Sequence, residues 1–321
     1  MRDGFFEKHQ TTAPRREFND KSLQRLKEAI KSLPGLEDSL NDNNLNFQDM
    51  TEIHVFGYGS LPDQPHYPPD EISEAYLWGY SRDLCCKSAR SGTRKFNGLT
   101  LGLDLNPEGI VPGAILTYRT TNAEQLCEML EAFAEREVVK EMPIYKFSMV
   151  EIEKQDGSKA MALTCVADKD SRGYVGDGLS LLEKKRLNAQ QQQELTLRRK
   201  GKIIAEANGF LPKSGKHTTS KSYFDRFVRF PLQNNLVSVD QQDLAQMSDI
   251  RKKRQLALYK EQQRMLMLAN MVDHYRGRLH EDMPAVADLL EEAEAEQMKS
   301  WRAKRAEAHK VRRPPNPHPS R

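Results

Sequence analysis

The spacing of apolar residues divides the chain into three parts. Up to about residue 50 the sequence is polar, and one stretch has apolar residues at helical intervals, namely Leu23, Leu26, Ile30 and Leu33. This spacing predicts a helix from Asp20 to Leu33, stopped by Pro34-Gly35. The next segment, Glu37 to Asn46, is rich in Asn and Asp and is typical of a linker. We expect residues 1–50 to form a polar N-terminal extension, which either docks on the body or serves in targeting or secretion.

Between residues 51 and 235 the pattern is that of strands around one helix. Strands are predicted at residues 53–56, 75–80, 99–105, 110–118, 144–152 and 160–167. Pro112 marks an edge or a bulge, and Asp156-Gly157 is a turn that joins the last two strands as a hairpin. A helix is predicted from Asn122 to about Val138. Many strands around one helix predict a small α+β domain with a curved or closed mixed sheet.

The predicted helix carries the most informative local pattern. Its apolar stripe consists of Ala123, Leu126, Leu130 and Phe133, and the next position of that stripe is Glu137. Three other glutamates, Glu128, Glu131 and Glu135, fall off the stripe and can face water. An inward carboxylate suits a proton shuttle. The alternative is that Glu137 frays out with the last turn, or pairs with Arg136 or Lys140.

Beyond the strands the chain returns to helical patterns. Ser180 with Glu183 forms a capping box for a polar helix, and the segment ending at Gly209 is typical of a helix with a glycine stop. Residues 215–222 indicate a polar loop, and Tyr223 to Phe230 an aromatic segment that packs back on the body. Residues 236–321 are predicted to be a charged helical extension with a basic, Pro-rich tail. This extension is either a solvated helix and tail or a partner-binding helix.

Composition narrows the class of protein. The chain has 38% hydrophobic and 30% charged residues, so we expect part of it to lie outside the main core. A net charge of +3 does not by itself imply nucleic acid, and no apolar run approaches a membrane span of roughly 20 residues. The start of the chain lacks a signal-peptide core, and the four cysteines have no metal-site or disulfide spacing. A reducing, cytoplasmic location is the default expectation.

A glycine-containing loop follows the first predicted strand, at His54-Val55-Phe56-Gly57-Tyr58-Gly59-Ser60-Leu61. Glycines let a ligand approach the main chain, and successive exposed N–H groups can hold a carboxylate or an oxyanion. The plain alternative is a glycine-rich corner of a hairpin. A dinucleotide fingerprint is excluded, because Pro62 stands where a third glycine is required.

Several motifs in order resemble one family. They are residues 55–61, Gly79-Tyr80-Ser81-Arg82, residues 98–104, Arg136-Glu137 and residues 174–180. Together they resemble the ChaC-type γ-glutamylcyclotransferases over about residues 53–210. Three features depart from that pattern: Pro62-Asp63 follows the loop where the family usually continues toward a tryptophan, Ser91-Gly92 with Arg90 and Arg94 replaces an Arg-Gly pair, and a Gln-rich insert precedes Gly209.

The resemblance implies a compact α+β body with a small barrel-like sheet, and a lyase that cleaves glutathione to 5-oxoproline and cysteinylglycine without a metal or cofactor. It implies that Glu137 is the catalytic glutamate. It also implies that the loop binds the γ-glutamyl end of the substrate, through Val55, Phe56, Gly57, Tyr58, Gly59, Ser60 and Leu61. Tyr145 matches a pocket tyrosine of the family, although it stands eight residues after the glutamate, further than expected.

The alternatives to a glutathione-cleaving enzyme differ in the substrate or in the class of protein. The same chemistry could act on other γ-glutamyl amides, or the domain could be a degenerate member that binds a protein partner through its C-terminal arm. Some members of the family that are delivered into host cells require a host thioredoxin. The resemblance therefore also leaves open a secreted bacterial effector with thioredoxin as its activator.

Overall fold

The computed structural model describes residues 19–88, 97–119, 122–138, 143–211, 216–229, 231 and 247–311. The motif at Arg90 to Arg94, the first 18 residues and the basic tail from residue 312 lie outside the described residues.

Five strands form a closed barrel in the order β1-β3-β2-β4-β5. They are β1 (Ile53–Gly57), β2 (Glu71–Ser88), β3 (Gly98–Tyr118), β4 (Tyr145–Lys154) and β5 (Lys159–Ala167). Neighbouring strands are antiparallel except β1 and β5, which close the barrel in parallel at Val55 and Leu163. Because side chains alternate along a strand, Phe56 packs in a cluster made only of strand residues, whereas Val55 packs on the opposite face with the helices. The prediction of an α+β domain with a closed sheet is confirmed.

Two predicted strands, 99–105 and 110–118, are one long strand, β3, paired along β2. The interruption in the sequence pattern is a bulge in which residues 106–109 stand opposite Gly79, which has a φ of +81°. At Gly109 a Cβ atom would lie 2.2 Å from the Tyr80 carbonyl oxygen, so a glycine is required there. The pairing of β3 with β1 covers Ala114 to Tyr118. Pro112 lies outside this pairing and is paired with β2, as expected for an edge position.

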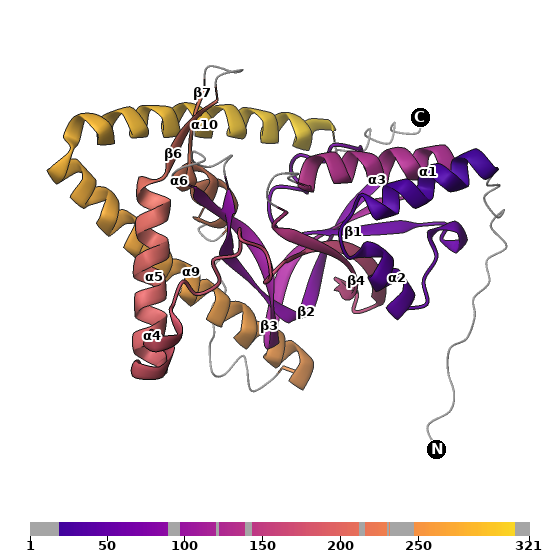
Figure 1. Cartoon of the computed structure of the whole chain (residues 1–321), viewed down its shortest axis with the longest axis horizontal. Coiled ribbons are helices and arrows are strands. Elements are labelled where there is room, and N and C mark those ends of the chain that lie inside the picture. Colours follow the sequence, from indigo (N-terminus) through magenta and orange to yellow (C-terminus); the bar gives the residue numbers. More distant parts are fainter. Residues whose placement is uncertain are drawn as a thin grey trace, which may run out of the picture.

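The N-terminal segment packs on the barrel. Helix α1 (Asp20–Lys31) and helix α2 (Leu36–Asp42) bury Leu26, Leu36 and Leu40 in the same cluster as Val55. The short helix η1 (Phe47–Asp49) adds Phe47 to this cluster. Figure 1 shows α1 running beside α3 (Ala123–Glu137) above the sheet. The linker interpretation of residues 37–46 is therefore wrong, because two leucines of α2 at helical spacing outweigh its Asn and Asp content.

The segment after β5 builds a second layer. It contains α4 (Leu181–Arg186), α5 (Ala189–Glu206), the hairpin β6 (Asn208–Leu211) and β7 (Lys216–Thr219), α6 (Ser220–Phe224) and the π-helical turn η2 (Asp225–Arg229). The capping box at Ser180 and Glu183 is confirmed. The prediction that Gly209 stops a helix is wrong, because α5 ends at Glu206 and Gly209 pairs in β6. The polar-loop interpretation of residues 215–222 is also wrong for the described part, which forms β7 and α6. Phe224 and Phe227 are buried, so the aromatic segment does pack on the body.

Two long helices complete the chain, α9 (Asp249–Asp282) and α10 (Pro284–Val311). Helix α9 crosses behind α5, and α10 runs across the end of the molecule that carries β7 and α6 (Figure 1). Helix α9 buries Met265, Leu268 and Val272 with residues of α5 and η2, so it is not a solvated helix as one alternative expected. None of the helices in the described part of the chain has the length and apolar character of a membrane span.

Candidate active site

The glycine loop leaves β1 in a tight turn. A Cβ atom on Gly57 would lie 2.8 Å from the Cδ atom of Pro62, so the proline folds back on the end of the strand and only glycine fits there. The Tyr58 carbonyl accepts a hydrogen bond from Nη1 of Arg82 on β2, at 3.1 Å. A Cβ atom on Gly59 would lie 3.6 Å from the Tyr223 hydroxyl, which places the loop next to α6.

Helix α3 brings a carboxylate to this loop. Asn122 caps the start of the helix, and the predicted stripe from Ala123 to Phe133 is buried. At its end, Arg136 Nε donates to Glu137 Oε1 at 2.6 Å, and the Glu137 side chain is 19% exposed. Glu137 is thus held inward and also pairs with Arg136, while Lys140 lies outside the described residues.

The Arg136 guanidinium joins the helix end to the loop. Its Nη1 donates to the Gln64 carbonyl at 2.5 Å, and its Nη2 donates to the Ser60 hydroxyl at 2.8 Å. A planar guanidinium with several donors suits such a bridge between a carboxylate and two oxygen acceptors. Glu137 is therefore fixed relative to Ser60 through a single, largely buried side chain.

Three tyrosines lie around this carboxylate. Tyr58 donates to the Cys165 carbonyl at 3.0 Å, and Tyr145 donates to the Leu101 carbonyl at 2.6 Å. The Leu101 N–H donates to the hydroxyl of Tyr223 at 3.5 Å. Burial raises the pKa of all three phenols, and the nearby charge of Glu137 raises each pKa further. The hydroxyls are therefore neutral near pH 7 and can act as hydrogen-bond donors.

The residues predicted from sequence fall into three groups. Glu137, Tyr58, Ser60 and Tyr145 converge as described above, with Gly57 and Gly59 shaping the loop. The side chains of Val55 and Phe56 point into the core, so these two residues offer only their main chain to the loop. Leu61 is partly buried against the same cluster as Val55.

Sequence reasoning missed Tyr223 and Arg82 as neighbours of the loop. Tyr223 comes from α6, far along the chain from the loop, and its only sequence signal is an aromatic segment. Arg82 belongs to a motif that carries the resemblance, but nothing in its spacing shows that it would bond to Tyr58.

The cysteines are poor nucleophile candidates. All four are buried, and burial raises the pKa of Cys165, with the charge of Glu137 adding to the rise. Among the described residues, no group of three or more His, Cys, Asp or Glu side chains could hold a metal ion.

These features define an α+β barrel protein with a buried arginine–glutamate pair beside a glycine loop. Residues 53–191 match the model of a family described as ChaC-like protein. No curated protein matches the chain by sequence.

Solved structures with a similar arrangement include a γ-glutamyl cyclotransferase specific to glutathione from yeast. It is 15% identical and covers 70% of this chain and 99% of its own, with a TM-score of 0.45. Its selenomethionine-labelled form is 16% identical, covers 70% and 97%, and has a TM-score of 0.43. A solution structure of a protein from Arabidopsis thaliana is 25% identical, covers 47% of this chain and 91% of its own, and has a TM-score of 0.26.

Proposed function

We propose that this chain is a γ-glutamylcyclotransferase that converts glutathione to 5-oxoproline and cysteinylglycine. The observation that carries the proposal is the carboxylate of Glu137, which Arg136 ties to the Ser60 hydroxyl of the glycine loop. The family match of residues 53–191 supports the same reaction class. In this proposal Glu137 is the catalytic residue, and the loop from Val55 to Leu61 together with Tyr145 binds the γ-glutamyl group.

The mechanism follows from the chemistry of the substrate. The α-amine of the γ-glutamyl group attacks its own side-chain carbonyl and closes a five-membered ring. The enzyme holds the glutamyl chain folded, so that a rare conformer becomes the resident one. The neutral hydroxyls of Tyr58 and Tyr145 lie near the carboxylate and can help to orient the polar substrate.

Proton transfer completes the reaction. Glu137 accepts a proton from the attacking amine and returns one to the departing amide nitrogen, so one carboxylate serves both steps in sequence. The tetrahedral oxyanion is stabilised by N–H groups of the Tyr58-Gly59-Ser60 turn. The ring C–N bond forms first and gives the tetrahedral intermediate, whose collapse breaks the C–N bond of the γ-amide and releases cysteinylglycine, so no covalent enzyme intermediate is required.

The direct test is incubation of the full chain with glutathione and measurement of 5-oxoproline. The assay is run with and without reduced thioredoxin, because a rise seen only with thioredoxin would identify that protein as an activating partner. Other γ-glutamyl dipeptides are compared in the same assay, since Pro62 alters the loop that faces the substrate. Faster turnover of one of those dipeptides would assign the substrate to another γ-glutamyl amide.

A folded chain that turns over no γ-glutamyl compound under any of these conditions would overturn the proposal. A stable partner recovered with such an inactive chain would favour a binding module instead.

A further inference from the structure

Helix α10 lies against the short helix that carries Tyr223. Three buried side chains of α10 recur at intervals of seven, Ala287, Glu294 and Trp301, so that one stripe of the helix faces the body. This stripe lies beyond residue 191, where the match to the ChaC-like family ends. Its contacts with α6 therefore belong to this chain's own extension.

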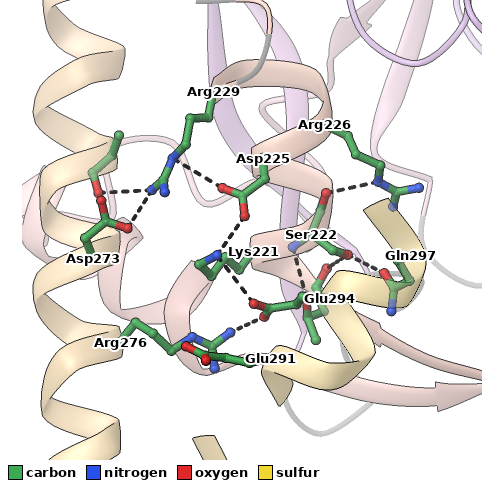
Figure 2. Close-up of polar contacts among 12 residues, drawn as sticks. Lys221, Ser222, Asp225, Arg226, Arg229, Asp273, Arg276, Glu291, Glu294 and Gln297 are labelled. Atoms are coloured by element: carbon green, nitrogen blue, oxygen red, sulfur yellow. Dashed lines mark hydrogen bonds and ion pairs between the residues drawn. The ribbon is translucent and has the colours of Figure 1, made fainter. Parts of the chain in front are cut away.

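Polar contacts from α10 hold the two residues that precede Tyr223. Lys221 Nζ lies 3.4 Å from Glu294 Oε2 and 2.7 Å from Asp225 Oδ2. The Ser222 hydroxyl donates to Oε1 of Gln297. Figure 2 shows Glu294 and Gln297 reaching from α10 to Lys221 and Ser222.

Glu294 is itself fixed from the opposite side. Its Oε1 pairs with Nη2 of Arg276 on α9, and both side chains are buried. Because a buried ion pair is costly to separate, α9 and α10 are held together where α10 meets α6.

An aromatic row makes a second connection. The Trp301 ring lies edge-on to Phe227 at 6.3 Å between centroids, and Phe227 lies 5.0 Å from the ring of Tyr223. Polar contacts thus run from α10 to the side chains of Lys221 and Ser222, and aromatic contacts run through Phe227 to the ring of Tyr223.

Tyr223 in turn reaches the candidate active site. Its hydroxyl accepts the N–H of Leu101, whose carbonyl accepts from Tyr145. The same hydroxyl lies 3.6 Å from the position of a Cβ atom on Gly59. Tyr223 therefore lies next to the glycine loop and bonds to strand β3, whose Leu101 carbonyl accepts from Tyr145.

We infer that α10 is a brace that positions the Tyr223 hydroxyl in the active site, so that the C-terminal extension is part of the machinery of turnover. Gln297 and Glu294 are positioning residues that act through α6. The Tyr223 hydroxyl accepts the N–H of Leu101 and is also hydrogen-bonded to the Thr100 side chain, and in this inference its proton turns to a polar group of the substrate when one is bound. The kinetic part of this inference rests on the proposed function.

The test compares the full-length wild type with Gln297→Ala, Tyr223→Phe and the double variant. Gln297→Ala removes the contact of the Ser222 hydroxyl with α10 and leaves that hydroxyl the Thr219 carbonyl as its acceptor, without disturbing the Arg276–Glu294 pair. The matched control is Glu291→Gln on α10, which removes an exposed ion pair with His280 of α9; among the described residues Glu291 forms no hydrogen bond or ion pair with α6. Values of kcat and KM for glutathione are measured by 5-oxoproline release, together with thermal unfolding.

We expect Tyr223→Phe and Gln297→Ala each to lower kcat/KM about fivefold to tenfold, the scale of one hydrogen bond. The double variant should be no slower than Tyr223→Phe alone, because both changes remove the same interaction. Glu291→Gln should keep wild-type kinetics. Wild-type kcat/KM in folded Gln297→Ala, or a loss that multiplies with that of Tyr223→Phe, would overturn the brace.

A second measurement does not depend on activity. Hydrogen exchange at the Leu101 amide and along residues 220–229 should be faster in Gln297→Ala and unchanged in Glu291→Gln. If the wild type releases no 5-oxoproline, the proposed function fails and this exchange decides the inference alone. Unchanged exchange in Gln297→Ala would overturn it.

Discussion

Two largely buried arginine–glutamate pairs serve different parts of this molecule. Arg136 and Glu137 are adjacent in sequence at the end of α3, with side chains 10% and 19% exposed. Arg276 and Glu294 come from α9 and α10, with side chains 6% and 7% exposed. The chemistry of the two pairs is the same, but the use of the carboxylate oxygens differs.

At Glu294 both oxygens are engaged, Oε1 by Arg276 and Oε2 by Lys221. At Glu137 the bond that the described residues make is from Arg136 to Oε1, and the carboxylate keeps some contact with solvent. A carboxylate with an accessible oxygen can exchange a proton with a substrate, whereas one closed on both sides can only hold its neighbours together. Exposure and partner count, rather than the pairing itself, distinguish the candidate catalytic glutamate from the structural one.

The largest expected effect is the loss of turnover in Glu137→Gln. The variant keeps an oxygen acceptor for Arg136 but has no base, so 5-oxoproline release should fall about a hundredfold or more. Kinetics and circular dichroism on the same preparation check the loss and the fold. Wild-type release by the folded variant would remove Glu137 from the catalytic role.

The corresponding change at the other pair should act on stability. Glu294→Ala leaves the buried Arg276 without its carboxylate and should lower the free energy of unfolding by about 3 kcal/mol. Urea denaturation of the full chain measures this difference. A midpoint equal to that of the wild type would show that the pair does not hold α9 and α10 together.

Arg136→Lys tests whether the geometry at the site matters beyond charge. A lysine keeps the positive charge but cannot reach Glu137, Gln64 and Ser60 together, so kcat/KM should fall about tenfold. The proper comparison is with Arg276→Lys, which we expect to change stability more than turnover. Equal kinetics for Arg136→Lys and the wild type would mean that charge alone suffices.

A smaller effect is the pH dependence of the free energy of unfolding that we expect from a third buried ion pair, Asp83 with Lys200. Burial opposes the ionised form of Asp83, but the charges of Lys200 and Arg264 outweigh it and lower the pKa of this carboxyl. A lowered pKa stabilises the fold above the unfolded value of about 3.9, and this contribution is lost as the pH falls below it. The stability advantage of the wild type over Asp83→Asn should therefore shrink below about pH 4. Equal differences in urea midpoint at pH 7 and pH 3 would contradict this linkage.

The spacing of apolar residues in the sequence predicted most strands of the barrel and, within the candidate site, the helix that carries Glu137. The stripe of α3 and the β4–β5 hairpin follow from periodicity, because burial on one face leaves a direct record in sequence. The split of β3 into two strands was wrong, since the bulge at residues 106–109 interrupts the pattern without ending the strand. Helix α2 was missed because its polar residues masked two buried leucines.

The rest of the site depends on contacts between distant segments. The sequence indicates Arg136 as part of a family motif and as a pairing partner of Glu137, but its bonds to Ser60 and Gln64 depend on where the loop lies in the fold. Tyr223 reaches Leu101 across more than a hundred residues of chain, and no spacing rule records such a contact. The catalytic and binding roles of all these residues remain predictions.

The fold of Pro62 onto Gly57 has a consequence for ligand entry. Pro62 packs so closely on Gly57 that a methyl group would not fit between them, and this contact restricts the conformation of the turn in the absence of substrate. A ligand would then lose little of its affinity to the ordering of this segment. If the loop binds substrate as proposed, selectivity would then depend on whether a peptide's shape matches this turn rather than on closure of the loop around each ligand.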